Sequence, residues 1–138
     1  MRKVMIVALA AVLLLPLSST AFAAKGGGDG NAGPSIALAQ VSGGAGTIPA
    51  LGSTVAFATT YPSNVQNPRI EVFCYQKGAL VYGEAGGATD SFLLGGGGSV
   101  WLWNGGGPAD CTANLFYFGM HAGSQTYNLL ASTSFAAN

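Results

Sequence analysis

Charged side chains are scarce in this 138-residue chain, which has five Lys or Arg, five Asp or Glu and a single histidine. A nucleic-acid binder normally carries a basic patch that neutralises phosphates, and attachment to anionic lipid needs a cluster of Lys or Arg. Beyond residue 23 the cations are Lys25, Arg69 and Lys77, so three positive charges minus five negative ones leave a formal charge of −2. The composition therefore argues against nucleic acid and anionic membranes as partners.

Familiar catalytic and metal-binding motifs are also missing. The chain has no Gly-x-Ser-x-Gly, His-Glu-x-x-His, P-loop or Cys-x-x-Cys pattern. His121 lies in the predicted Gly119–Gln125 connection and has no recognisable partner base or nucleophile. The carboxylates fall on or beside different predicted strands, and sequence alone does not give the separation that a glycosidase requires. We therefore predict that the protein is not an enzyme and uses no metal or cofactor.

Residues 1–23 have the order of a secretory signal peptide. Arg2 and Lys3 supply the charged start, residues 4–17 form an apolar stretch, and small side chains precede Ala24 at the two positions that a signal peptidase inspects. Cleavage after Ala23 is expected to release a secreted, extracellular chain with no membrane span, and an uncleaved N-terminal anchor is the alternative. Residues 24–33 contain five glycines and predict a flexible leader.

The remaining residues, 34–138, predict one all-β domain. No apolar period near 3.6 persists for the length of a helix, and short apolar or alternating runs are separated by Gly, Pro, Asn and Ser clusters. Lys77-Gly78 is predicted to form a tight hairpin turn. The spacing favours a two-sheet antiparallel sandwich of seven or eight strands. The predicted strands span residues 35–41, 53–61, 69–76, 79–84, 91–94, 100–103, 111–118 and 127–135.

Cys74 and Cys111 are the only cysteines. Export would place them in an oxidising compartment, where a disulfide persists. In the chain-entropy model such a bond is worth about 4 kcal/mol, which is comparable with the net stability of a small domain. The alternative is a redox-active or metal-binding pair, but only one histidine is available as a further ligand. We therefore predict a structural disulfide.

Two segments resemble strands C and F of bacterial secreted immunoglobulin-like domains. They are NPRIEVFCY at residues 67–75 and ADCTANLFYF at residues 109–118. The resemblance implies an immunoglobulin-like two-sheet sandwich, a fold that hosts many functions and transfers none of them by itself. Antibody-type domains join strands B and F by a disulfide, whereas residues 53–61 contain no cysteine. Cys74 and Cys111 are therefore expected to link neighbouring strands C and F of one sheet.

Strand alternation predicts one aromatic surface. If the two cysteines point into the core, every second residue on each of their strands points outward. Because strands C and F are neighbours, their outward aromatic residues should form an exposed patch, which commonly marks an interaction surface. The alternative is that a strand is flipped or the disulfide lies outside, which would bury these side chains. The expected patch comprises Phe73, Tyr75, Phe116 and Phe118.

Trp101 and Trp103 form a Trp-x-Trp pair that could stack on sugar rings, and core packing is the alternative. Taken together, the features favour a secreted, non-enzymatic immunoglobulin-like recognition or adhesion domain that binds an unknown protein or cell-surface partner. One alternative is a self-assembling structural surface subunit, a homo-oligomer, because few charges oppose pairing of edge strands. The other is a carbohydrate-binding module that uses Trp101 and Trp103.

Overall fold

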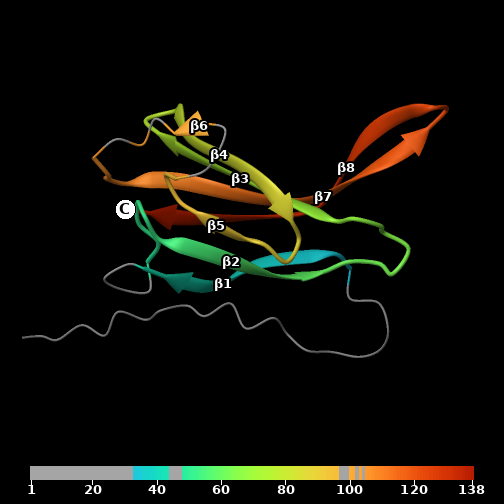
Figure 1. Cartoon of the computed structure of the whole chain (residues 1–138), viewed down its shortest axis with the longest axis horizontal. Coiled ribbons are helices and arrows are strands. Elements are labelled where there is room, and N and C mark those ends of the chain that lie inside the picture. Colours follow the sequence, from blue (N-terminus) through green and yellow to red (C-terminus); the bar gives the residue numbers. More distant parts are fainter. Residues whose placement is uncertain (1–32, 44–47, 97–99, 102, 104) are drawn as a thin grey trace, which may run out of the picture. The chain divides into compact units, whose positions relative to one another are not determined.

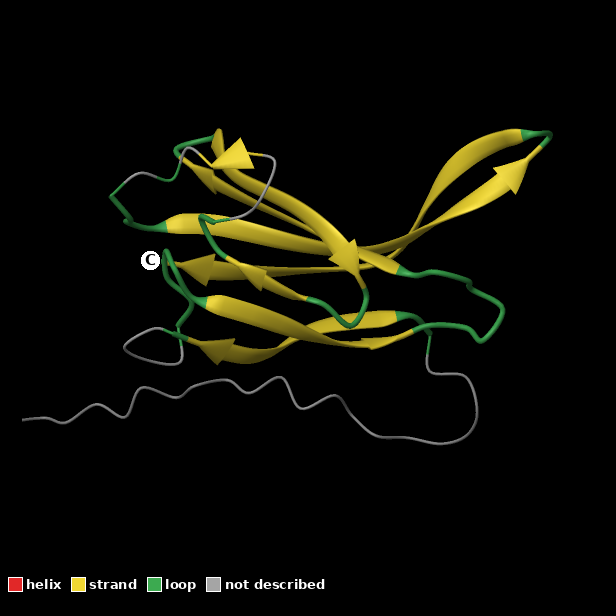
Figure 2. Cartoon of the chain, viewed as in Figure 1, coloured by secondary structure: helices red, strands yellow, loops and turns green. Residues whose placement is uncertain are grey.

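The computed structural model describes residues 33–43, 48–96, 100, 101, 103 and 105–138, with the backbone alone at residues 100 and 101. The predicted signal peptide, residues 1–23, and the predicted leader up to residue 32 lie outside the described residues. Within the described part of the chain every regular element is a strand (Figure 2). That part contains no helix long and apolar enough to cross a membrane.

Eight strands follow one another along the described chain, and each overlaps a strand predicted from the sequence. The third strand has the predicted bounds, whereas the last two extend well beyond them at both ends. The strands are β1 (Ser35–Ser42), β2 (Thr54–Thr60), β3 (Arg69–Gln76), β4 (Ala79–Gly87), β5 (Ser91–Leu93), β6 (Val100–Trp101), β7 (Ala109–His121) and β8 (Ser124–Ala137).

The strands form two antiparallel sheets that pack as a sandwich (Figure 1). One sheet has the order β1-β2-β5, and the other has the order β6-β4-β3-β7-β8, in which β6 is only two residues long. Each pair of neighbouring strands is antiparallel. These findings confirm the predicted all-β, two-sheet antiparallel sandwich of seven or eight strands.

Two tight turns set the register of the hairpins. Lys77 and Gly78, between β3 and β4, have φ angles of 49° and 81°, and Ala122 and Gly123, between β7 and β8, have the same pair of values. Positive φ at both central residues is typical of a type I′ turn, whose twist matches that of the flanking strands. The Lys77-Gly78 turn confirms the predicted hairpin. The second turn corrects the sequence prediction, because most of the expected Gly119–Gln125 connection is strand.

The core lies between the two sheets and is built from alternate residues of their strands. In β3, Ile70, Val72 and Cys74 are fully buried. Phe57 of the small sheet contacts Phe135 of β8 with ring centroids 5.9 Å apart, so an aromatic contact joins the sheets. Burying such large apolar surfaces is the dominant favourable contribution to folding. The other wholly buried large side chains are Val55, Tyr82, Phe92, Leu94, Cys111 and Leu115.

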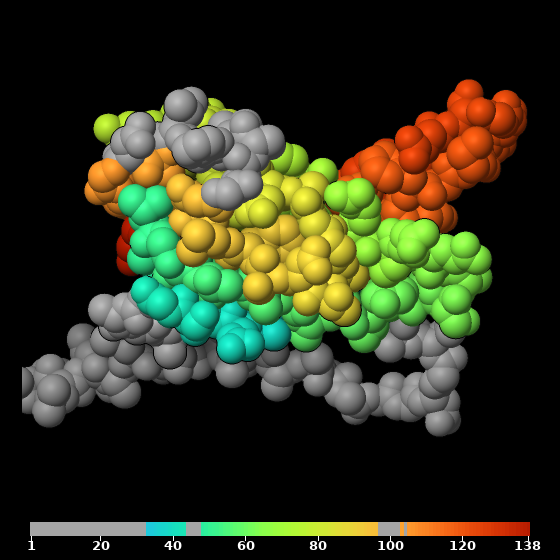
Figure 3. Space-filling view, in the orientation of Figure 1, coloured from blue at the N-terminus to red at the C-terminus, as the bar shows by residue number. Residues whose placement is uncertain are grey.

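The β7–β8 hairpin continues past the rest of its sheet. Pairing between β3 and β7 ends at the Arg69–Phe116 row, whereas β7 and β8 remain paired as far as His121 and Ser124. Figures 1 and 3 show the end of this hairpin, in orange to red, projecting from the body of the sandwich. We call residues Phe116–Leu129 the arm.

Candidate recognition surface

The faces of β3 and β7 are those expected from strand alternation. The disulfide side of β7 is buried at Cys111, Ala113 and Leu115. On the opposite side of β3, Phe73 is half-buried and Tyr75 is 40% exposed. Because cross-strand partners share a face, the side chains on this outer side of β3 adjoin those of Thr112, Asn114 and Phe116 on β7.

The four predicted aromatic residues fall into two groups on this outer face. Phe73 and Tyr75 lie opposite Thr112 and Asp110, toward the disulfide end of β3, whereas Phe116 and Phe118 belong to the arm. A polar row of Glu71, Asn114 and Ser132 crosses the sheet between the two groups. The structure therefore does not place the four aromatics in one continuous patch.

Phe116 corrects the expectation that all four side chains are exposed, because only 3% of its surface is accessible. Tyr127 stacks on its ring at a centroid distance of 4.7 Å, and Phe118 meets the ring edge-on at 5.4 Å. Such pairs stabilise by about 0.5–1.5 kcal/mol beyond the area that they bury. Phe116 therefore forms a small apolar cluster on the outer face, separate from the core between the sheets.

One face of the arm is apolar and accessible to solvent. Phe118 pairs with Tyr127 across the hairpin, and Phe116 pairs with Leu129, so these side chains share a face with Met120 and its polar partner Gln125. The exposed fractions are 46% for Phe118, 73% for Met120, 44% for Tyr127 and 55% for Leu129. We call these four residues the apolar face of the arm.

The opposite face of the arm is polar. Its rows pair Tyr117 with Asn128, Gly119 with Thr126, and His121 with Ser124. The predicted lone histidine thus lies at the exposed end of a strand, beside the turn. A two-stranded ribbon that leaves large apolar side chains on one side and polar ones on the other is amphipathic, and a projecting apolar face of this kind is typical of a contact surface.

A hydrogen-bond network on the outer face holds the base of the arm against the sheet. Glu71 on β3 accepts a bond of 2.7 Å from the Tyr127 hydroxyl and one of 3.1 Å from Asn114 Nδ2. Ser132 Oγ in turn donates to Asn114 Oδ1 at 2.7 Å. Partial burial, together with its hydrogen bond to the Glu71 carboxylate and the charge of that carboxylate, raises the pKa of Tyr127 to about 12. The network therefore ties β8 to β3 across β7.

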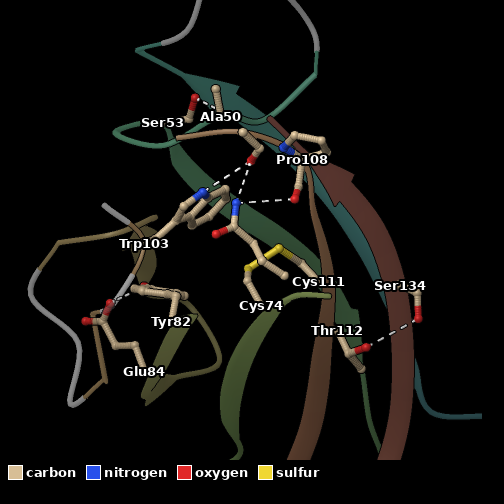
Figure 4. Close-up of a disulfide and its surroundings, with 12 residues drawn as sticks. Ala50, Ser53, Cys74, Tyr82, Glu84, Trp103, Pro108, Cys111, Thr112 and Ser134 are labelled. Atoms are coloured by element: carbon tan, nitrogen blue, oxygen red, sulfur yellow. Dashed lines mark hydrogen bonds between the residues drawn. A yellow bond between two sulfur atoms is a disulfide. The ribbon is translucent and has the colours of Figure 1, made fainter. Parts of the chain in front are cut away.

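The predicted disulfide between Cys74 and Cys111 is present and links two residues that pair directly across β3 and β7 (Figure 4). Both cysteines are buried within the core, so the bond is placed as a structural staple. It joins neighbouring strands of one sheet, as expected from the absence of cysteine in β2. A disulfide is consistent with an oxidising compartment, extracellular or periplasmic.

The Trp-x-Trp pair does not form a described sugar-stacking site. Trp103 is 3% exposed and belongs to the core cluster, and its indole N–H donates to the Gly107 carbonyl at 3.2 Å (Figure 4). Gln76 Nε2 donates to the same carbonyl at 3.1 Å, which fixes the glycine-rich segment before β7. The side chain of Trp101 lies outside the described residues. Burial of Trp103 favours the packing role that was the alternative.

Three of the described carboxylates, those of Glu71, Glu84 and Asp90, accept local hydrogen bonds. Glu84 accepts the hydroxyl of Tyr82, and burial together with this carboxylate raises the pKa of that tyrosine. Asp90 accepts the Gly87 N–H at 2.7 Å in the turn before β5, beside a surface hollow of about 470 Å³ that Arg69 also lines. Among the described residues, no group of three or more His, Cys, Asp or Glu side chains has metal-binding geometry.

Sequence reasoning missed three of the four residues of the apolar face, namely Met120, Tyr127 and Leu129. Their signal was the Ala122-Gly123 dipeptide, because a two-residue turn at this place pairs Phe118 with Tyr127 and Phe116 with Leu129. Reading the segment as a loop concealed that register. Comparison with known proteins gave no matching family model, curated protein or solved structure.

Proposed function

We propose that the protein is a secreted, non-enzymatic recognition domain of the immunoglobulin-like class, which binds a protein on a cell surface through the apolar face of the arm. The order β4-β3-β7-β8 in one sheet and β1-β2-β5 in the other supports this class, because it matches strands C′-C-F-G and A-B-E of that fold. The Cys74–Cys111 disulfide and the leader in residues 1–23 support export.

The observation that carries the proposal is the exposed apolar face. Phe118, Met120, Tyr127 and Leu129 gather on one side of a two-stranded ribbon, where between 44% and 73% of the surface of each side chain remains exposed after folding. Aromatic and methionine side chains are enriched in the buried centres of protein interfaces. Binding a partner would therefore provide the burial that the domain itself does not.

The charges of the described chain support a protein as the partner. Its cations are Arg69, which pairs with Phe116 at the base of the arm, and Lys77, which lies in the turn after β3. The projecting arm carries no Asp, Glu, Lys or Arg between residues 116 and 129. Phosphate-rich partners are recognised mainly through cations, whereas an uncharged apolar face suits an apolar patch on another protein.

The proposal is tested by measuring saturable binding of the labelled mature protein to cells of the organism that produces it. Phe118→Ser with Met120→Ser should weaken binding at least tenfold, because two exposed contact residues lose about 1 kcal/mol or more each at an interface. The matched control, Ser124→Ala with Thr126→Ala, changes the polar face of the same arm and should bind like the wild type. Equal binding by all three proteins, each with an unchanged melting temperature, would refute this role of the arm.

A further inference from the structure

β8 presents an open strand edge within the arm, and this edge is distinct from the apolar face. We infer that two copies of the chain associate by antiparallel pairing of β8 with β8 over residues 125–129. This inference goes beyond the proposed function, because it concerns contact between copies through the strand edge and leaves the apolar face free for a different protein.

β8 is an unprotected edge strand. It is fourteen residues long and pairs only with β7 among the described strands. Proteins protect sheet edges with short strands, lysine, proline or bulges, because an open edge presents unpaired N–H and C=O groups. The sequence SQTYNLLASTSFAA contains no charged residue and no proline, and its one register shift lies at the base of the arm, between the Leu115 and Phe116 rows.

Toward its far end, the edge of β8 approaches the rest of the sandwich. At the other end of β8, the chain continues into Asn138, whose N–H donates to the Pro49 carbonyl at 2.8 Å and whose carbonyl accepts from the Leu51 N–H at 2.7 Å. β1 also contacts β8. Residues 125–128, in contrast, lie in the portion that extends beyond β3, and Leu129 lies in the last row that reaches it. For all five residues, β7 is the one paired neighbour in the described structure.

A second copy is the occupant that these features favour. Its edge is equally uncharged, so two such edges approach without like-charge repulsion, while a charged strand would find no counter-charge along the arm. Antiparallel pairing about a two-fold axis brings each edge against itself, which makes the contact self-complementary and closed. The partner must therefore present an uncharged strand edge of the same length, and a second copy of this chain presents one.

Side-chain alternation requires the two-fold axis to lie at a residue, and we place it at Tyr127, the middle of residues 125–129. Paired residues must share a face, and a two-fold axis at Tyr127 opposes Thr126 to Asn128 of the second copy, both of which belong to the polar face. The same register sets Tyr127 opposite its equivalent and so places the two apolar faces side by side. Two linked apolar faces would also strengthen attachment to a surface that carries several partner molecules, through effective concentration.

The test is the mass of the mature protein over a concentration series, measured by sedimentation equilibrium. Wild type should shift from monomer to dimer, and Thr126→Lys with Asn128→Lys should weaken the association at least tenfold, because the selected register places these new cations opposite one another. The control, Ala37→Lys with Gln40→Lys, adds the same charge to exposed positions of β1, the outer strand of the other sheet, and should dimerise like the wild type.

A cross-linking measurement keeps the test informative if the lysine variant fails to fold. Thr126→Cys and Asn128→Cys should each give little covalent dimer alone under mild oxidation, whereas a mixture of the two should give a mixed disulfide dimer. Dimerisation with this pattern supports the pairing. A wild type that stays monomeric, a dimer that only the β1 control disrupts, or equal cross-linking in all three samples overturns it. A monomer that still binds cells through Phe118 and Met120 would overturn the pairing and leave the proposed function standing. An arm-paired dimer that binds no cells would support the pairing and overturn the proposed function.

Discussion

Removing the Cys74–Cys111 bond is expected to destabilise the domain by about 4 kcal/mol. The two cysteines are 37 residues apart, and the chain-entropy model converts a loop of that length into roughly 4 kcal/mol of lost freedom in the unfolded chain. For a domain of this size, each kcal/mol corresponds to about 4 °C. Reduction should therefore lower the melting temperature by about 15 °C.

The assay is calorimetric unfolding of three samples at one pH: the oxidised wild type, the reduced wild type, and the double variant Cys74→Ala with Cys111→Ala. Both cysteines are buried and directly paired, so the double substitution also removes two core sulfur atoms and should lower the melting temperature at least as much as reduction does. Thiol titration of the unfolded, unreduced wild type should find no free thiol. A shift smaller than about 5 °C in both altered samples would show that the bond does not staple the fold as argued.

Three further predictions concern the arm and the leader. Phe116→Ala should lower the free energy of unfolding in urea by about 3 kcal/mol, because the ring is buried beneath Phe118 and Tyr127. Phe118→Ala, at an exposed position, should lower it by about 1 kcal/mol or less. Equal losses would contradict the separate outer cluster. The absorbance of tyrosinate should show Tyr127 titrating near pH 12, assigned by its loss in Tyr127→Phe, and Glu71→Gln should lower that value. Because the folded pKa lies above the ordinary value of 10.0, the associated stability is present below pH 10 and is lost as the pH rises toward 12; an unchanged titration in Glu71→Gln would exclude the carboxylate as a cause. N-terminal sequencing of exported protein should begin at Ala24, and retention of Met1 would contradict cleavage.

The strands could be predicted from sequence because the signals are local. In β3, Ile70, Val72 and Cys74 alternate with more polar or exposed neighbours, and the strand has the predicted bounds. The ends of β7 and β8 could not be found in this way. Residues 119–126 are rich in glycine and polar side chains, which is typical of loops, and their strand form comes from pairing across the Ala122-Gly123 turn.

The same limit explains the candidate surface. Alternation assigned Phe116 correctly to the face away from the disulfide, but its burial depends on Tyr127, a residue eleven positions later that the hairpin register brings over its ring. Glu71 likewise reaches Tyr127 across an intervening strand. A one-dimensional pattern states which side of a strand a residue occupies. It does not state which neighbours cover it, because those come from other strands.

The position of the disulfide also determines how the domain would respond to mechanical force. The bond joins neighbouring strands of one sheet, so a pull on the two chain ends would pass directly from β3 to β7 through the sulfur atoms. The intervening β4, β5 and β6 would carry no tension. At about 3.4 Å for each extended residue, the 37-residue separation corresponds to roughly 125 Å of chain that cannot extend while the disulfide is intact. A domain exposed to shear at a cell surface would thus yield at β1, β2 and the arm while the segment between the cysteines stayed slack.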